Sequence, residues 1–185
     1  MTRTAILVYV GLVFAAMAMA PLGGFGIKVT LPDASDPRQK DAALLVQPMG
    51  CHGPGASVLA RAEGIVNGKR KTIELTSFVL DKGDEQSRGP LVMLKRQWPS
   101  NGTWVVAITA QREGMHAHAI AKIAPNGNIL TIARPSERSY NEAMTLPDGK
   151  TKLLLYPFSG ESKVAATYIV WGDLQAAVEH TLKGL

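Results

Sequence analysis

The sequence contains a single cysteine, Cys51, and aromatic residues make up only 6% of its 185 residues. A single cysteine excludes an intramolecular disulfide, so a folded domain must be stabilised by its hydrophobic core. The 46% of hydrophobic residues and 19% of charged residues are typical of a folded chain with such a core. For the lone cysteine we expect a buried, inert thiol, with an intermolecular disulfide or a metal ligand as the alternatives.

The sequence also lacks a concentrated charge of either sign. Its 20 Lys and Arg residues against 15 Asp and Glu residues give a net charge of +5, and the densest basic run is only Lys69–Lys71. Nucleic-acid binding normally uses a clustered basic face, often with aromatic side chains that stack on the bases. We therefore expect no nucleic-acid partner.

The motifs of the common enzyme classes are missing. There is no Gly-x-Ser-x-Gly elbow, no glycine-rich phosphate loop and no dinucleotide-binding fingerprint. Asp81, Asp84 and Glu85 lie close together, but they lack the regular oxygen spacing of a calcium loop, so we expect a solvated turn. The sequence thus indicates no catalytic residue and no organic cofactor, and a non-enzymatic role is expected.

An uncharged apolar segment, Ala5–Ala20, follows the basic residue Arg3 and ends in small residues. This order is typical of a secretory signal peptide, here residues 1–20. We expect cleavage after Ala18, because the proline that follows the segment disfavours cleavage at its end; an uncleaved anchor formed by residues 5–20 is the alternative. The protein is therefore expected to be periplasmic or secreted, or else membrane-anchored through this segment alone.

The remainder of the chain has the pattern of a β protein. Residues 21–41 are rich in glycine, proline and aspartate, and predict a linker with a short edge strand at Ile27–Leu31. Residues 42–133 predict a β-sandwich domain, because short apolar runs alternate with turn residues; residues 47–55 form a predicted loop. Asn67-Gly68 is the strongest hairpin signal, since a two-residue turn needs positive φ at both positions. The expected strands are Ala42–Val46, Ser57–Val66, Lys69–Leu80, Leu91–Trp98, Thr103–Ala110, Met115–Ile123 and Ile129–Ala133.

The last part, residues 134–185, predicts two further strands, Lys152–Tyr156 and Val164–Trp171, followed by a helix. Asp173 is a suitable N-cap, and the apolar residues that follow it fall near one helical face. These residues are Leu174, Ala177, Val178 and Leu182. This part either completes the sandwich or packs against it. The predicted fold is therefore mostly β: an immunoglobulin-like antiparallel β-sandwich with a C-terminal helix.

The stretch Leu91–Ala110 contains a strand, a proline turn, Gly102-Thr103-Trp104 and an alternating strand. It resembles the strand pair of small exported immunoglobulin-like modules, such as the YtkA-like family of periplasmic and cell-surface domains. The resemblance covers Ser57 to Ile123 and implies the sandwich fold and an extracytoplasmic compartment. Functions in that family are diverse, with links to metal handling and respiratory assembly. The chain departs from antibody-type domains, because it lacks their paired inter-sheet cysteines.

Two tryptophans, Trp98 and Trp104, flank the proline turn of this stretch. We expect them to pack across a hairpin as part of the core, with an aromatic platform for a ligand as the alternative.

Side chains that bind soft metals occur at two places in the sequence. One loop contains Met49, Cys51 and His52, and one strand begins with Met115, His116 and His118. Residues two apart in a strand point the same way, so His116 and His118 could hold one copper or zinc ion, with Cys51 or His52 completing the site. The alternative is a pair of unliganded imidazoles, because the two histidines lie opposite an alanine-rich face and are expected to be solvated.

The sequence thus leaves two functions open, besides a third, an enzyme of unrecognised type. The first is an exported, non-enzymatic binding or accessory module of the cell envelope, which would reach another envelope protein through exposed strand edges or loops. The second is a periplasmic copper- or zinc-binding protein that uses His116, His118, Cys51 and His52.

Overall fold

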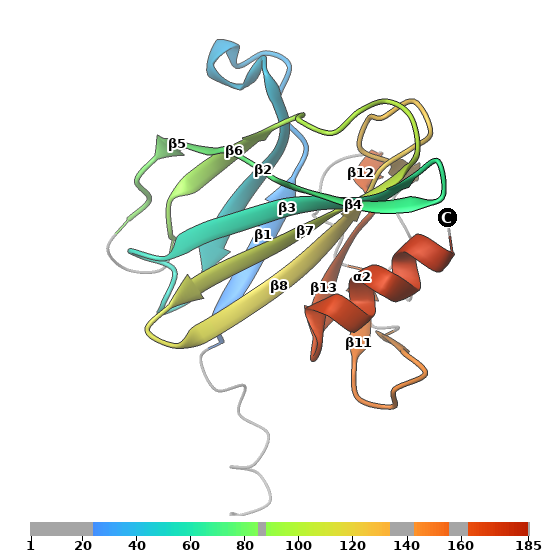
Figure 1. Ribbon diagram of the computed structural model, residues 1–185. Helices are drawn as coiled ribbons and strands as arrows, with labels where there is room; N and C mark the ends of the chain where they lie inside the picture. The colour runs from blue at the N-terminus through green and yellow to red at the C-terminus, as the bar shows by residue number, and fades with distance from the viewer. Residues whose placement is uncertain (1–23, 85–87, 134–142, 156–162, 185) are drawn as a thin grey trace, which may run out of the picture.

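Figure 1 shows the computed structural model of the protein, which describes residues 24–84, 88–133, 143–155 and 163–184. The expected leader, residues 1–20, lies outside these residues. The elements are β1 (Gly26–Thr30), η1 (Pro37–Gln39), β2 (Ala42–Met49), β3 (Ser57–Val66), β4 (Lys69–Glu74), β5 (Ser77–Asp81), β6 (Leu91–Lys95), β7 (Thr103–Arg112), β8 (Met115–Lys122), β9 (Thr131–Ala133), β10 (Ala143–Thr145), β11 (Lys152–Leu155), β12 (Lys163–Ala165), β13 (Thr167–Trp171) and α2 (Leu174–Lys183).

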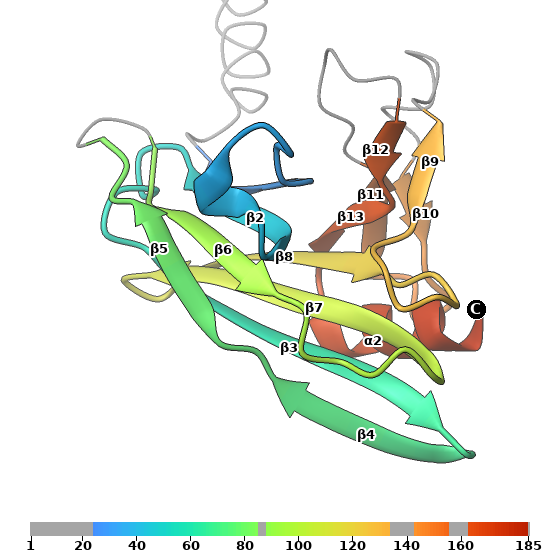
Figure 2. The same cartoon turned by 90° about the horizontal axis from the view of Figure 1, so that it is seen from above.

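The strands form two large antiparallel sheets that pack face to face. One sheet has the order β1-β2-β6-β5, the other has the order β10-β11-β13-β8-β7-β3-β4, and β9 and β12 form a small separate pair. Figure 2 shows the smaller sheet lying across the larger one. The prediction of a mostly β, antiparallel sandwich with a C-terminal helix is confirmed, whereas the immunoglobulin-like topology stays a prediction.

The main core lies between the two sheets and follows from the alternation of side chains along each strand. In β7, Trp104, Val106, Ile108 and Ala110 all point into this core, as their period of two requires. Trp98 and Trp104 are both buried there, and each indole N–H donates to a backbone carbonyl, of Gly127 and Asn101 respectively, at 2.8 Å. The expectation that the two tryptophans belong to the core is therefore confirmed.

The predicted strand Lys69–Leu80 is wrong, because the chain changes sheets within it. β4 pairs with β3 in the larger sheet, while β5 pairs with β6 in the smaller one, and Figure 2 shows the chain passing between them. Leu75 lies at the crossing, buried in the core, and its N–H donates to Ala60 O at 2.8 Å. Leu75 thus has both a backbone hydrogen bond and an apolar environment at the bend, and these two interactions stabilise the corner between the sheets.

The expected pairing of Leu91–Trp98 with Thr103–Ala110 is also wrong. β6 pairs with β2 and β5, whereas β7 pairs with β3 and β8, so the two strands lie in opposite sheets. The turn residues between them therefore connect the two layers of the sandwich and do not close a hairpin.

The predicted loop at residues 47–55 begins later than expected, because β2 continues to Met49 and includes the buried Pro48. Proline has no N–H to give to a neighbouring strand. Pro48 O accepts a hydrogen bond from Gly89 N at 2.8 Å, and Gly89 lies just before the first residue of β6. The nitrogen of Pro48, which has no hydrogen to donate, therefore faces the end of the β2–β6 ladder. A proline is tolerated at such a position.

The C-terminal part adds strands to the larger sheet and a helix to its outer face. β13 pairs with β8, β11 pairs with β13, and α2 packs against β7, β8, β13 and β3. A second apolar cluster fills the space between helix and sheet; it includes Val105, Ala107, Ile120, Val170, Ala177, Val178 and Leu182. Asp173 caps the helix as predicted, since its Oδ1 accepts from the N–H groups of Gln175 and Ala176. Within the described ranges, no helix has the length and apolar character needed to cross a bilayer.

Candidate functional site

The outer face of the larger sheet is only partly covered by α2. Beyond the helix, β3, β7 and β8 present two rows of register partners: Leu59, Thr109 and His118 in one row, and Ser57, Gln111 and His116 in the next. The two histidines of β8 were expected to be solvated. His116 is exposed as expected, whereas His118 is half-buried, and Ile120 on the same face is fully buried beneath α2.

His116 and His118 lie side by side on this face. Their rings are nearly parallel, at an interplanar angle of 5°, with centroids 6.0 Å apart. His118 is half-buried, and its Nδ1 lies 3.0 Å from Thr109 Oγ1 on the neighbouring strand. Burial lowers the pKa of His118, and the nearby His116 and Arg61 lower it further. Burial thus favours the uncharged form of the His118 ring, and the contact with Thr109 Oγ1 fixes its orientation.

A charged network lies beside this pair and joins the sheet to the helix. Glu63 is buried, and its two carboxylate oxygens accept from Arg61 Nε at 2.7 Å and from Arg70 Nη2 at 2.6 Å. Arg61 and Arg70 in turn contact Gln175 and Glu179 of α2, at 3.1 and 3.2 Å. Burial raises the pKa of Glu63, but the two arginines outweigh it and hold the pKa below its usual value. The network thus fixes the helix on the sheet and compensates a buried charge.

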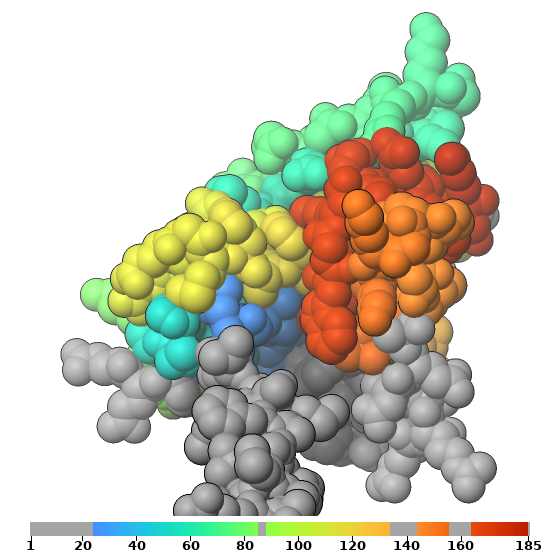
Figure 3. Space-filling model, turned by 90° about the horizontal axis from the view of Figure 1, so that it is seen from below, coloured from blue at the N-terminus to red at the C-terminus, as the bar shows by residue number. Residues whose placement is uncertain are grey.

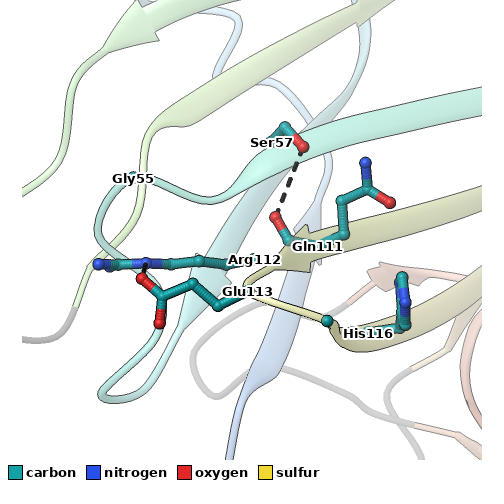
Figure 4. Close-up of a pocket in the computed structure, with 7 residues that line it drawn as sticks. Gly55, Ser57, Gln111, Arg112, Glu113 and His116 are labelled. Carbon is teal, nitrogen blue, oxygen red and sulfur yellow. Dashed lines mark hydrogen bonds and ion pairs between the residues drawn. The ribbon is translucent and has the colours of Figure 1, made fainter.

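An open hollow of about 660 Å³ lies at the end of β7 and β8, next to His116 (Figure 4). Arg112 crosses it, contacting Glu113 at 3.0 Å and donating to the carbonyl of Pro54 in the β2–β3 loop. Ser57 Oγ donates to Gln111 O at 3.5 Å on the opposite side. The lining is mostly polar, and the bond from Arg112 to Pro54 fixes the loop that contains Cys51 and His52 near the β7–β8 turn.

The structure brings together two of the four predicted metal ligands. His116 and His118 are adjacent, whereas His52 Nδ1 lies 4.0 Å from Glu113 Oε2 and Cys51 is exposed in the β2–β3 loop. The expectation of a buried thiol at Cys51 is therefore wrong, because the loop that contains it lies on the surface. Across the described part of the chain, no three His, Cys, Asp or Glu side chains are grouped closely enough to hold one metal ion.

Sequence reasoning missed both Thr109 and the charged network. Thr109 becomes a partner of His118 only through the register of β7 and β8. The network had a visible signal, since Arg61 and Glu63 are charged residues two apart in an otherwise apolar run, and both point away from the core.

A second hollow, of about 270 Å³, lies at the seam between β1 and the C-terminal strands. Its lining is apolar, with Ile27, Met49, Leu154, Ile169 and Trp171, and the Trp171 side chain is 57% exposed. Figure 3 shows this face, with β1 in blue between β8 in yellow and β13 in red.

The edges of the two sheets differ in chemistry. β4 closes one end of the larger sheet with Lys69, Arg70 and Lys71, and such charges are a common protection of an edge against further pairing. β5 closes one end of the smaller sheet, pairs only with β6 among the described strands, and has no basic residue. On β5, Phe78 is 41% exposed and Val79 is 61% exposed. The β5 edge thus exposes two apolar side chains, and only its last residue, Asp81, is charged; the strand is irregular between Val79 and Asp81.

No protein-family model matches the chain, and no curated protein or solved structure is significantly similar to it. The resemblance to the YtkA-like family consequently stays a prediction.

Proposed function

We propose that the chain is an exported, non-enzymatic binding or accessory module of the cell envelope, whose partner adds an extended strand to the free edge of β5. The observation that carries this proposal is the contrast between the basic edge at β4 and the edge at β5, where Phe78 and Val79 are exposed and apolar. Strand addition uses the backbone groups of such an edge for affinity and alternate side chains for specificity.

The side chains of β5 indicate what the partner strand contains. Neighbouring residues of a strand point to opposite faces of the sheet, so Phe78 and Val79 would each meet the incoming strand on a different face. Lys95 Nζ lies 5.1 Å from the centre of the Phe78 ring, but its charge is paired with Asp41 at 3.2 Å and calls for no further acidic partner. The expected partner strand is therefore apolar on both faces.

Site-specific photocrosslinking tests the proposal in the cells that produce the protein. A photoreactive amino acid at Val79 of the full chain should give one discrete adduct in the envelope fraction. The same amino acid at Thr72, which is exposed on the protected edge β4, is the matched control and should give none. The photoreactive amino acid at Phe78 should give the same adduct, and the edge-blocking substitution Val79→Lys in that chain should remove it, because a lysine on an edge opposes further pairing.

Three outcomes would count against the proposal. Equal adducts at positions 72 and 79 would show unspecific contact, and no adduct at either position would show that β5 has no partner. An adduct of twice the mass of the chain would show that the partner is a second copy of this protein and not another envelope protein. Export is tested separately: finding the full-length chain soluble in the cytosol of the producing cells would overturn it.

A second candidate function is copper or zinc binding in the same compartment. The paired, parallel rings of His116 and His118 are the observation that favours it.

A further inference from the structure

We propose that His116 and His118 form a two-imidazole copper(II) site on the open face of the larger sheet, with the remaining positions on the ion filled by water. This inference deepens the second candidate function and is independent of the β5 partner, since the histidines lie on the other sheet.

The two rings are placed for chelation but have to turn toward each other. An imidazole nitrogen lies about 2 Å from a bound metal ion, so two ligand nitrogens on one ion lie at most about 4 Å apart. The ring centroids are 6.0 Å apart in the structure. His116 is exposed and free to rotate about its side-chain torsions, while His118 is half-buried and has the Thr109 contact. His118 is thus the fixed ligand and His116 the ligand that closes on the ion.

Thr109 prepares His118 for this role. When Nδ1 of His118 carries the proton and donates it to Thr109 Oγ1, the lone pair of Nε2 is free for an ion. A hydrogen bond of this kind on the second ring nitrogen fixes both tautomer and orientation in metal-binding histidines.

The charges around the pair are compatible with a cation. The groups that act electrostatically on His118 are His116 and Arg61. Arg61 is the charged group that opposes a cation most directly. Its Nε donates to Glu63 and its Nη2 donates to Gln175, so its positive charge is directed toward the charged network and α2.

Copper(II) is the ion that this donor set favours. Imidazole binds copper(II) more tightly than the other divalent first-row ions, and copper(II) accepts a tetragonal set of two nitrogens and water oxygens. Zinc sites in proteins normally use three or four protein ligands, and none of the described residues supplies a third side chain of the usual types.

The test is a titration of the full chain with copper(II) or zinc(II) at pH 7.4, followed by calorimetry and electron paramagnetic resonance. Cys51 is exposed and can bind or reduce copper, so the parent chain is titrated once for comparison and every variant is made in the Cys51→Ser background. The expected result is one copper(II) per chain with hyperfine coupling from two nitrogens, and an affinity for zinc at least about tenfold lower.

Variants separate the proposed site from other ligands. His116→Ala and His118→Ala should each remove the two-nitrogen signature, and Thr109→Val should weaken copper binding by about tenfold, since it removes the hydrogen bond that orients His118. His52→Ala and His180→Ala are matched controls and should bind copper unchanged. Copper binding that survives in the His116→Ala/His118→Ala double variant, or that disappears with Cys51→Ser alone, would overturn the site, as would zinc binding as tight as copper binding.

Discussion

Trp104 lies directly over Gly64, its register partner on the neighbouring strand. A Cβ atom added at Gly64 would come within 2.4 Å of the Trp104 ring and within 2.7 Å of Thr103 O. Because Trp104 is almost fully buried, its ring has no free space to move into. Trp104 can therefore pack in the core only because position 64 of β3 is a glycine.

Replacing Gly64 by alanine should destabilise the protein by about 1–3 kcal/mol, because the added methyl group overpacks a filled core. Chemical denaturation of the two proteins measures the difference in free energy of unfolding. Gly26→Ala is the control, since a Cβ atom there meets nothing within 4 Å, and its stability should be unchanged. Equal stabilities for Gly64→Ala and Gly26→Ala would contradict the packing described for Trp104.

Glu63 should make stability depend on pH in the acid range. Burial raises the pKa of Glu63, but Arg70 and Arg61 lower it more, so the folded state holds the charged form more strongly than the unfolded state does. The unfolded state then binds more protons, and the stabilisation is complete above the unfolded pKa of about 4.3 and is lost as pH falls through the lower folded pKa.

The variant Glu63→Gln tests this linkage. At pH 7 it should be less stable than the parent by about 1.5–3 kcal/mol, the usual value of hydrogen bonds to a charged group. The difference should shrink as the pH falls below about 4. A difference that stays constant between pH 7 and pH 3 would show that Glu63 is not the charged centre of the network.

The N-cap of α2 should contribute measurably to stability. Asp173→Ala removes the acceptor of the Gln175 and Ala176 N–H groups and should cost about 0.5–2 kcal/mol of unfolding free energy. Asp173→Asn keeps an acceptor at the same position and should restore most of the loss. If Asn and Ala destabilise equally, the cap does not act through this hydrogen bond.

Trp171 should dominate the solvent-accessible tryptophan fluorescence. Of the three tryptophans, Trp98 and Trp104 are buried and Trp171 is 57% exposed. Acrylamide should therefore quench the emission of Trp171 selectively, and Trp171→Phe should leave a blue-shifted spectrum that acrylamide hardly quenches. Unchanged quenching in this variant would mean that another tryptophan is open to solvent.

Local chemistry was readable from the sequence, whereas contacts between distant strands were not. Asn67 and Gly68 both adopt positive φ, 51° and 72°, as the hairpin prediction required. The pairing of His116 with His118 followed from their spacing in one strand. The corner at Leu75 was missed, because the apolar pattern continues through it and only the choice of partner strands reveals it. Thr109 was missed for the same reason, since its relation to His118 depends on register.

The passage of one chain segment from β4 to β5 has a mechanical consequence. The two layers of the sandwich are covalently continuous at Leu75, which is itself held in both the backbone ladder and the core. Separating the layers would pull Leu75 out of the core and break its hydrogen bond to Ala60, so we expect the two sheets to melt together. Unfolding of the sandwich should accordingly be one cooperative transition, with equal calorimetric and van't Hoff enthalpies.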